Sequence, residues 1–89
     1  MNSSLPPSTA KEWFEKNHER LGYLLSRWQD EHEYEDRADY KKAIVGWLPA
    51  GFKLTKFCLS TAFLAFSFTA NKEHFSVKVT DKTVAMTQP

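Results

Sequence analysis

The most informative run in this chain reads Phe63-Leu64-Ala65-Phe66-Ser67-Phe68-Thr69. Large apolar side chains alternate in it with small or polar ones, and a period of two is the pattern of a β-strand with one buried face. The alternation returns further on, where Phe75, Val77 and Val79 are separated by polar residues. The two runs predict two neighbouring antiparallel strands.

A hairpin with its tip at residues 71–72 sets the register of these strands. Because side chains alternate between faces, a slip by one residue would turn the whole apolar set of one strand outward. A four-residue loop over residues 70–73 keeps the same register, so the prediction does not depend on the type of turn. The predicted pairs are Phe68–Phe75, Phe66–Val77 and Leu64–Val79.

A second hairpin extends the sheet by one strand. Asp and Asn suit tight turns because they tolerate positive φ, and a two-residue turn at Asp81-Lys82 continues the apolar face. The predicted pairs are Val79–Val84 and Val77–Met86. Two hairpins derived separately therefore agree on one apolar face.

The first strand, residues 52–59, is less regular than the others. Its apolar residues change parity midway, from Phe52 and Leu54 to Phe57 and Leu59. A bulge near Thr55-Lys56 would bring all of them to one face, because one extra residue switches the side to which a strand points. Otherwise Phe52 and Leu54 point to the opposite face.

Two helices are predicted before the sheet. Thr9 and Glu12 match a capping box, which satisfies free N–H groups at a helix start, and the helix extends to about Gln29. A broad apolar stripe suits it to packing on a sheet. That stripe consists of Ala10, Phe14, Leu21, Leu25 and Trp28, with His18 within it and Trp13 and Leu24 at its margins. Asp36 is expected to cap a second helix over residues 37–48, which a proline ends.

These elements predict an α+β fold in which two N-terminal helices pack on one face of a four-stranded antiparallel meander sheet, in the order α-α-β-β-β-β. A chain of 89 residues is near the small end of what buries a core unaided, and its three Trp, three Tyr and seven Phe supply large apolar areas. We expect residues 1–8 to be disordered or loosely attached. Residues 9–88 are expected to form a single small domain.

Charge is distributed unevenly along the chain, although the formal net charge is only +1. Residues 1–36 hold four basic and eight acidic groups, whereas residues 37–89 hold eight basic and three acidic groups. This asymmetry indicates either an electrostatic binding face or two halves of the fold that attract each other. The single Cys58, expected to be buried, excludes an internal disulfide. With no signal peptide and an apolar run (57–68) too short to span a membrane, we expect a cytoplasmic protein without membrane contact.

The sequence has no motif for catalysis, cofactor binding or metal binding. It lacks Gly-x-Ser-x-Gly, Cys-x-x-Cys and a glycine-rich phosphate loop, and its three histidines lie in separate elements. The run Asp30–Asp36 holds five carboxylates and His32, which fits either a cation site or a solvated loop. Its spacing matches no known metal-binding loop. We therefore predict that the protein is not an enzyme and has no cofactor and no metal site.

The sheet face opposite the apolar set is the candidate binding surface. Its predicted interaction residues are Phe63, Ser67, Thr69, His74, Ser76 and Lys78, and its predicted phosphate contacts are Lys53, Lys56, Lys72 and Lys82. An uncovered face or edge strand suits docking by another protein or by a second copy of the chain. Alternatively, the Phe63 and His74 rings stack the bases of single-stranded RNA while the lysines contact phosphates. We favour a small intracellular, non-catalytic protein-interaction module, with self-association as one form, over nucleic-acid binding.

Overall fold

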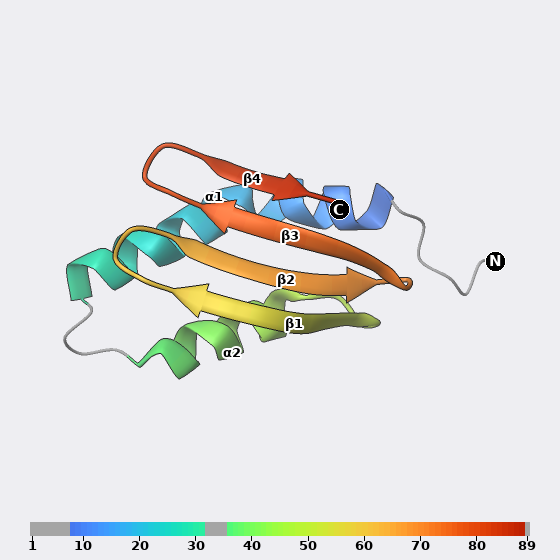
Figure 1. The fold of residues 1–89 in the computed structure, drawn as a ribbon, viewed down its shortest axis with the longest axis horizontal. Coiled ribbons are helices and arrows are strands. Elements are labelled where there is room, and N and C mark those ends of the chain that lie inside the picture. Colours follow the sequence, from blue (N-terminus) through green and yellow to red (C-terminus); the bar gives the residue numbers. More distant parts are fainter. Residues whose placement is uncertain (1–7, 32–35, 89) are drawn as a thin grey trace.

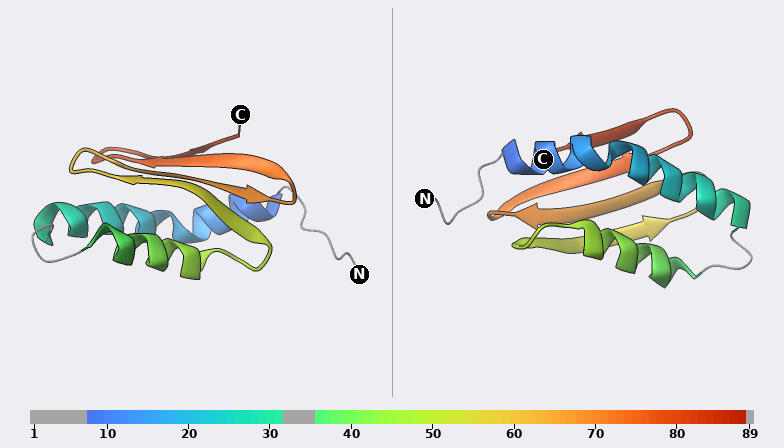
Figure 2. Two further views of the ribbon diagram at one scale, coloured as in Figure 1. Left: turned by 60° about the horizontal axis from the view of Figure 1, so that its bottom comes forward. Right: turned by 180° about the vertical axis from the view of Figure 1, so that it is seen from behind.

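The computed structural model of the protein describes residues 8–31 and 36–88. Within these residues, two helices precede four strands: α1 (Ser8–Glu31), α2 (Arg37–Trp47), β1 (Phe52–Leu59), β2 (Leu64–Ala70), β3 (Glu73–Val79) and β4 (Val84–Thr87). The strands pair in chain order with antiparallel neighbours, and Figure 1 shows this meander. Figure 2 shows α1 and α2 on one side of the sheet. The predicted α+β fold is confirmed.

The registers of β2, β3 and β4 confirm both predicted hairpins. All five predicted cross-strand pairs are present. Asn71 and Lys72 have positive φ angles of 54° and 68°, as the two central residues of a type I′ turn do. Ala70 and Glu73 pair directly, so the loop contains two residues and not four.

A β-bulge in β1 explains the irregular parity of the first strand. The pairing of β1 with β2 shifts between Leu54 and Lys56, so Thr55 is the extra residue. Leu54 and Phe57 lie opposite phenylalanines on the buried face of β2, which places them on the side that packs against the helices. Of the two alternatives that the sequence leaves open, the structure has the bulge, and Leu54 does not face away from the helices.

Aromatic rings form the centre of the core between α1 and the sheet. Phe68 is fully buried and stacks on Phe52 and Phe75 at centroid distances of 5.5 and 5.4 Å. Trp13 of α1 meets Phe68 edge to face at 5.5 Å, and its Nε1 donates a hydrogen bond to the Trp47 carbonyl oxygen at 2.7 Å. A single indole therefore joins α1 both to the sheet and to the end of α2.

The buried arc of α1 is turned relative to the predicted stripe. Trp13 and Leu24, expected at the margins, are buried, whereas Phe14 is partly buried. His18 is exposed, and its ring contacts that of Phe14 at a centroid distance of 6.1 Å. Trp13 is covered by Phe68 of the sheet and by the end of α2, and Leu24 lies on the side of α1 that faces α2.

The limits of α2 agree closely with the prediction. Asp36 is the N-cap, and its Oδ1 accepts a hydrogen bond from the Ala38 amide at 3.1 Å. The helix ends at Trp47, one residue before the predicted end, and Leu48 is its C-cap. Gly51, at φ 93°, then turns the chain into β1 in a conformation that residues with a side chain rarely adopt.

The start of α1 corrects the predicted capping box. The helix begins at Ser8, so Thr9 lies inside it and is not its N-cap. The remainder of the predicted loose segment, residues 1–7, lies outside the described residues.

Candidate interaction surface

The described helices leave one side of the sheet uncovered, and Figure 2 shows this side facing away from α1 and α2. Its side chains follow from the strand register, because residues opposite one another share a face. We call this surface the open face. Its strand residues are Lys53, Lys56, Cys58, Ala65, Ser67, Thr69, His74, Ser76, Lys78, Ala85 and Thr87.

Small side chains keep the centre of the open face low and polar. Ser67 and Ser76 lie opposite each other, with their hydroxyl oxygens 3.0 Å apart in a hydrogen bond. Ala65 and Thr69, two residues to either side along β2, are also small and partly buried by their neighbours. This part of the sheet therefore presents hydroxyl donors and acceptors beside an open hollow of ≈ 390 Å³, which Lys56, Ala65 and Ser67 help to line.

The formal charge on the open face is of one sign. Lys53 and Lys56 on β1 and Lys78 on β3 are exposed. Glu73 belongs to the helix-covered face, and the Asp81 Oδ1 accepts a hydrogen bond from a glutamine of α1 at 2.8 Å. In the described part of the chain, no carboxylate lies among the open-face residues. Such a patch produces a positive potential that attracts anionic groups.

The predicted interaction residues are brought together in part. Phe63, directly before β2, is partly buried, and the Lys78 Nζ lies 5.2 Å from its ring centroid in a cation–π contact. His74 lies opposite Thr69 and is exposed. Because Thr69 is six residues beyond Phe63, the Phe63 and His74 rings stand roughly 20 Å apart, at opposite ends of the face. They do not form the adjacent pair that base stacking requires.

The four lysines predicted to contact phosphates do not form one cluster. Lys53 and Lys56 lie on the open face, whereas Lys72 is in the β2–β3 turn and Lys82 in the β3–β4 turn. These turns stand at opposite ends of β3, a separation of about 20 Å at the usual rise of a strand. One small anion therefore cannot contact all four lysines.

A groove between α2 and β1 was missed by the sequence reasoning. Its lining residues are Arg37, Ala38, Lys41, Phe57, Cys58 and Leu59. Figure 1 shows α2 beside β1, a placement that only the tertiary packing creates. In the sequence, the one sign of this groove was an exposed lysine on the predicted second helix.

Cys58 corrects a further prediction, because its side chain is exposed and not buried. Its neighbours Phe57 and Leu59 face the helices, so Cys58 points to the other side of β1, opposite Ala65. The preference of cysteine for buried positions is overridden here by the alternation of the strand.

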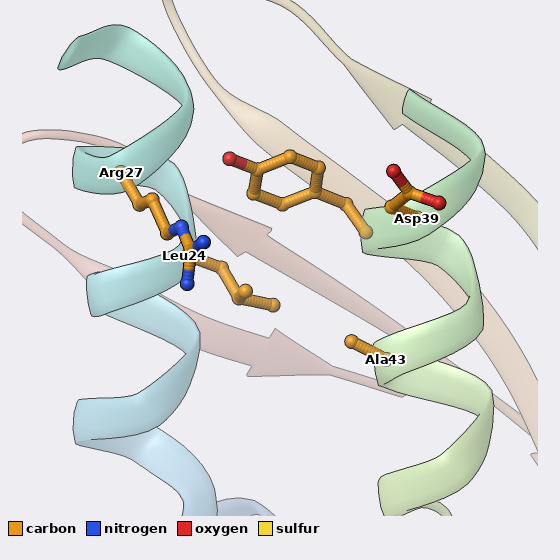
Figure 3. A pocket seen from close by; sticks show the side chains of 5 residues that line it. Leu24, Arg27, Asp39 and Ala43 are labelled. Carbon is orange, nitrogen blue, oxygen red and sulfur yellow. The ribbon is translucent and has the colours of Figure 1, made fainter. Parts of the chain in front are cut away.

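A second cleft, of ≈ 240 Å³, lies between α1 and α2. Figure 3 shows Leu24 and Arg27 reaching it from α1 and Asp39 and Ala43 from α2. The Tyr40 ring also lines it and packs edge-on against a tryptophan of α1 at 5.6 Å. The two walls carry opposite charges, in contrast to the open face.

Two features of the described residues bear on metals and membranes. Across residues 8–31 and 36–88, no group of three or more His, Cys, Asp or Glu side chains is placed to hold a metal ion. Residues 32–35 of the acidic run Asp30–Asp36 lie outside the described residues. Neither described helix combines the length and the apolar character needed to cross a membrane.

Comparison with protein-family models, with curated proteins and with solved structures finds no match for this chain. Its function must therefore be inferred from the surface just described.

Proposed function

We propose that this protein is a non-catalytic protein-interaction module whose open face docks an acidic surface of a partner protein. The observation that carries the proposal is the charge of that face, where Lys53, Lys56 and Lys78 stand without a carboxylate among the described residues. A patch of one sign attracts a partner of the opposite sign and fixes its orientation.

The small polar residues supply the second part of the recognition. Ser67, Thr69 and Ser76 place hydroxyl groups between the lysines. Carboxylates of a partner accept charge-assisted hydrogen bonds from ammonium groups and further hydrogen bonds from hydroxyls. The hollow on this face beside Lys56 and Ser67 is wide open. Small molecules bind in more enclosed sites, so we propose another folded protein as the ligand.

The same charges disfavour pairing of two copies through their open faces. A two-fold arrangement would bring the lysines of one copy against those of the other, and like charges across an interface are repulsive. We therefore propose a different protein as the partner. At low salt, we expect the isolated chain to show no dimer that depends on the open face.

Single-stranded nucleic acid is the alternative ligand for the same lysines, because ammonium groups bind phosphates as well as carboxylates. The positions of the rings support this alternative less. Lys78 already lies over the Phe63 ring, and His74 stands at the other end of the face. Single strands bind where successive bases stack on neighbouring rings, and the open face has no such pair among its described residues.

An NMR titration of the isotope-labelled protein distinguishes the two ligands. The probes are a polyglutamate peptide and an oligouridylate of equal length, each added at low and at physiological salt. We expect polyglutamate to shift the amide resonances of open-face residues such as Ser67, Thr69 and Ser76. The shifts should weaken as salt screens the exposed charges.

Charge reversal provides the matched control. The triple variant Lys53→Glu, Lys56→Glu, Lys78→Glu should lose the polyglutamate shifts. Reversal of three exposed lysines on the helices should retain them; these are Lys11, Lys16 and Lys42. Oligouridylate binding more than about tenfold tighter than polyglutamate would reassign the face to nucleic acid. Polyglutamate shifts that survive the triple variant, or that are missing at low salt, would refute the proposal.

A further inference from the structure

The turn between β2 and β3 determines which backbone groups of β1 face the outer edge of the sheet. In a two-residue hairpin, the residues that flank the turn, here Ala70 and Glu73, exchange both backbone hydrogen bonds. Along β2, the backbone N–H and C=O groups of successive residues point alternately toward β3 and toward β1. Those of Thr69, Ser67 and Ala65 therefore point toward β1. Their partners on β1 are consequently bonded to β2, and the outward groups belong to Phe52, Leu54, Phe57 and Leu59.

The outer edge of β1 is anchored at its ends and open between them. The Phe52 amide donates to a carbonyl of the preceding turn at 3.1 Å, and the Arg37 Nε donates to the Leu59 carbonyl oxygen at 2.9 Å. Both hydrogen bonds agree with the inference that the backbone groups of Phe52 and Leu59 point away from β2. The outward groups of Leu54 and Phe57 have no hydrogen-bond partner within the described ranges. Unpaired groups at a sheet edge are a template for another strand.

The groove between α2 and β1 follows this open edge. Its main part, of ≈ 470 Å³, is lined largely by apolar surface around Phe57, with Arg37 and Lys41 on the α2 wall. A smaller hollow continues along the edge past the bulge at Thr55, and Lys41 and Lys56 line it. The described lining residues of both hollows include three cations and no carboxylate.

We propose that an extended acidic segment of a partner protein binds along this groove as an additional strand of the sheet. Its backbone pairs with the outward groups of Phe57 and the Leu59 amide, on one side of the bulge. Its side chains alternate between the two faces of the sheet, so they approach Lys41 on the α2 side and Lys56 on the open-face side. Main-chain bonds provide affinity, and the cations select acidic side chains.

A second copy of the chain is a poorer occupant than an acidic segment. Antiparallel pairing of β1 with its own copy would bring the positively charged Lys53 and Lys56 side chains of both chains close together. It would also align two strands that are each bent by the bulge at Thr55. Lysines and bulges on an edge strand are the usual protection against such pairing.

Fluorescence anisotropy with a labelled, end-capped short peptide of Glu-Glu-Val repeats tests this contact, because such a strand carries carboxylates on both of its faces. We expect binding at low salt, with slower hydrogen exchange of the Phe57 and Leu59 amides. A peptide with the same side chains but N-methylated at every second residue loses the donors along one edge and keeps its charge. It should bind about tenfold more weakly, because strand addition needs those donors.

Neighbouring lysines on α2 provide matched variants, because Lys41 lines the groove, Lys42 does not, and both are exposed. Lys41→Glu should weaken binding about fivefold, and Lys42→Glu less than about twofold. The double variant Lys53→Glu, Lys78→Glu should still bind the peptide, which separates this contact from docking on the open face. Equal binding of the N-methylated peptide, equal effects at Lys41 and Lys42, or no binding at low salt would each overturn the proposal.

Discussion

Phe68 is the residue at which the architecture can be tested most directly. Its side chain is 0% exposed, and its ring meets those of Trp13, Phe52 and Phe75 at centroid distances of 5.5, 5.5 and 5.4 Å. The substitution Phe68→Ala removes the ring that joins α1 to the neighbours of β2 on both sides. It leaves a cavity that the rigid sheet cannot close.

The expected loss of stability follows from these contacts. Truncation of a buried Phe to Ala lowers the free energy of unfolding by about 3–5 kcal/mol. Each aromatic pair adds about 0.5–1.5 kcal/mol beyond its buried area, so the loss of the ring pairs of Phe68 places this substitution near the upper limit, at about 5 kcal/mol. A chain of 89 residues is typically stable by about 4–13 kcal/mol. The loss is therefore comparable with the lower end of that range.

Urea titration followed by tryptophan fluorescence and far-UV circular dichroism measures this loss. If Phe68→Ala does not fold, Phe68→Leu retains much of the apolar volume and provides a smaller, measurable decrease. Tyr23→Ala is the control, because Tyr23 is 61% exposed on α1 and its removal should change stability by less than about 0.5 kcal/mol. A decrease below about 1.5 kcal/mol for Phe68→Ala would refute the central position of this ring.

Three further substitutions test the turn, the helix cap and the open face. Lys72→Gly should raise the free energy of unfolding by about 0.5–1 kcal/mol, because Lys72 has a φ of 68° that favours glycine; an unchanged urea midpoint would contradict this. Asp36→Ala should lower the free energy of unfolding by about 1 kcal/mol, because α2 loses its N-cap. An unchanged free energy of unfolding would show that this cap does not stabilise the helix. Phe63→Glu should weaken polyglutamate binding with the circular dichroism spectrum unchanged, since Phe63 is only partly buried; undiminished binding would remove Phe63 from the surface.

The sheet could be predicted from the sequence wherever one face is buried and the other is polar. In the β2–β3 and β3–β4 hairpins, a slip by one residue would separate Phe66, Val77 and Met86 onto different sides, and the positions of the turns exclude a slip by two. Local alternation and the turn positions therefore suffice for these strands. The sequence of the first strand allows two alternatives, because its change of parity near Thr55 becomes a bulge only when β2 is in place to pair with it.

The candidate site was predictable in its residues but not in its arrangement. The face that carries Ser67, Ser76 and Lys78 follows from the same alternation that defines the core. The cation–π contact of Lys78 with Phe63, and the distance of that ring from His74, depend on how far each residue stands along the strands.

Alternation of side chains and the positions of the turns together determine the register of β2, β3 and β4, because a slip by one residue would turn a buried face outward. Packing between elements decides the rest. Trp13 is buried because it meets both the sheet and the end of α2, and the groove beside Lys41 exists because α2 lies beside β1. The open edge at Phe57 follows from the place of β1 at the end of the strand order. Contacts of this kind join residues far apart in the chain and leave no periodic signal, so the three-dimensional structure is needed to find them.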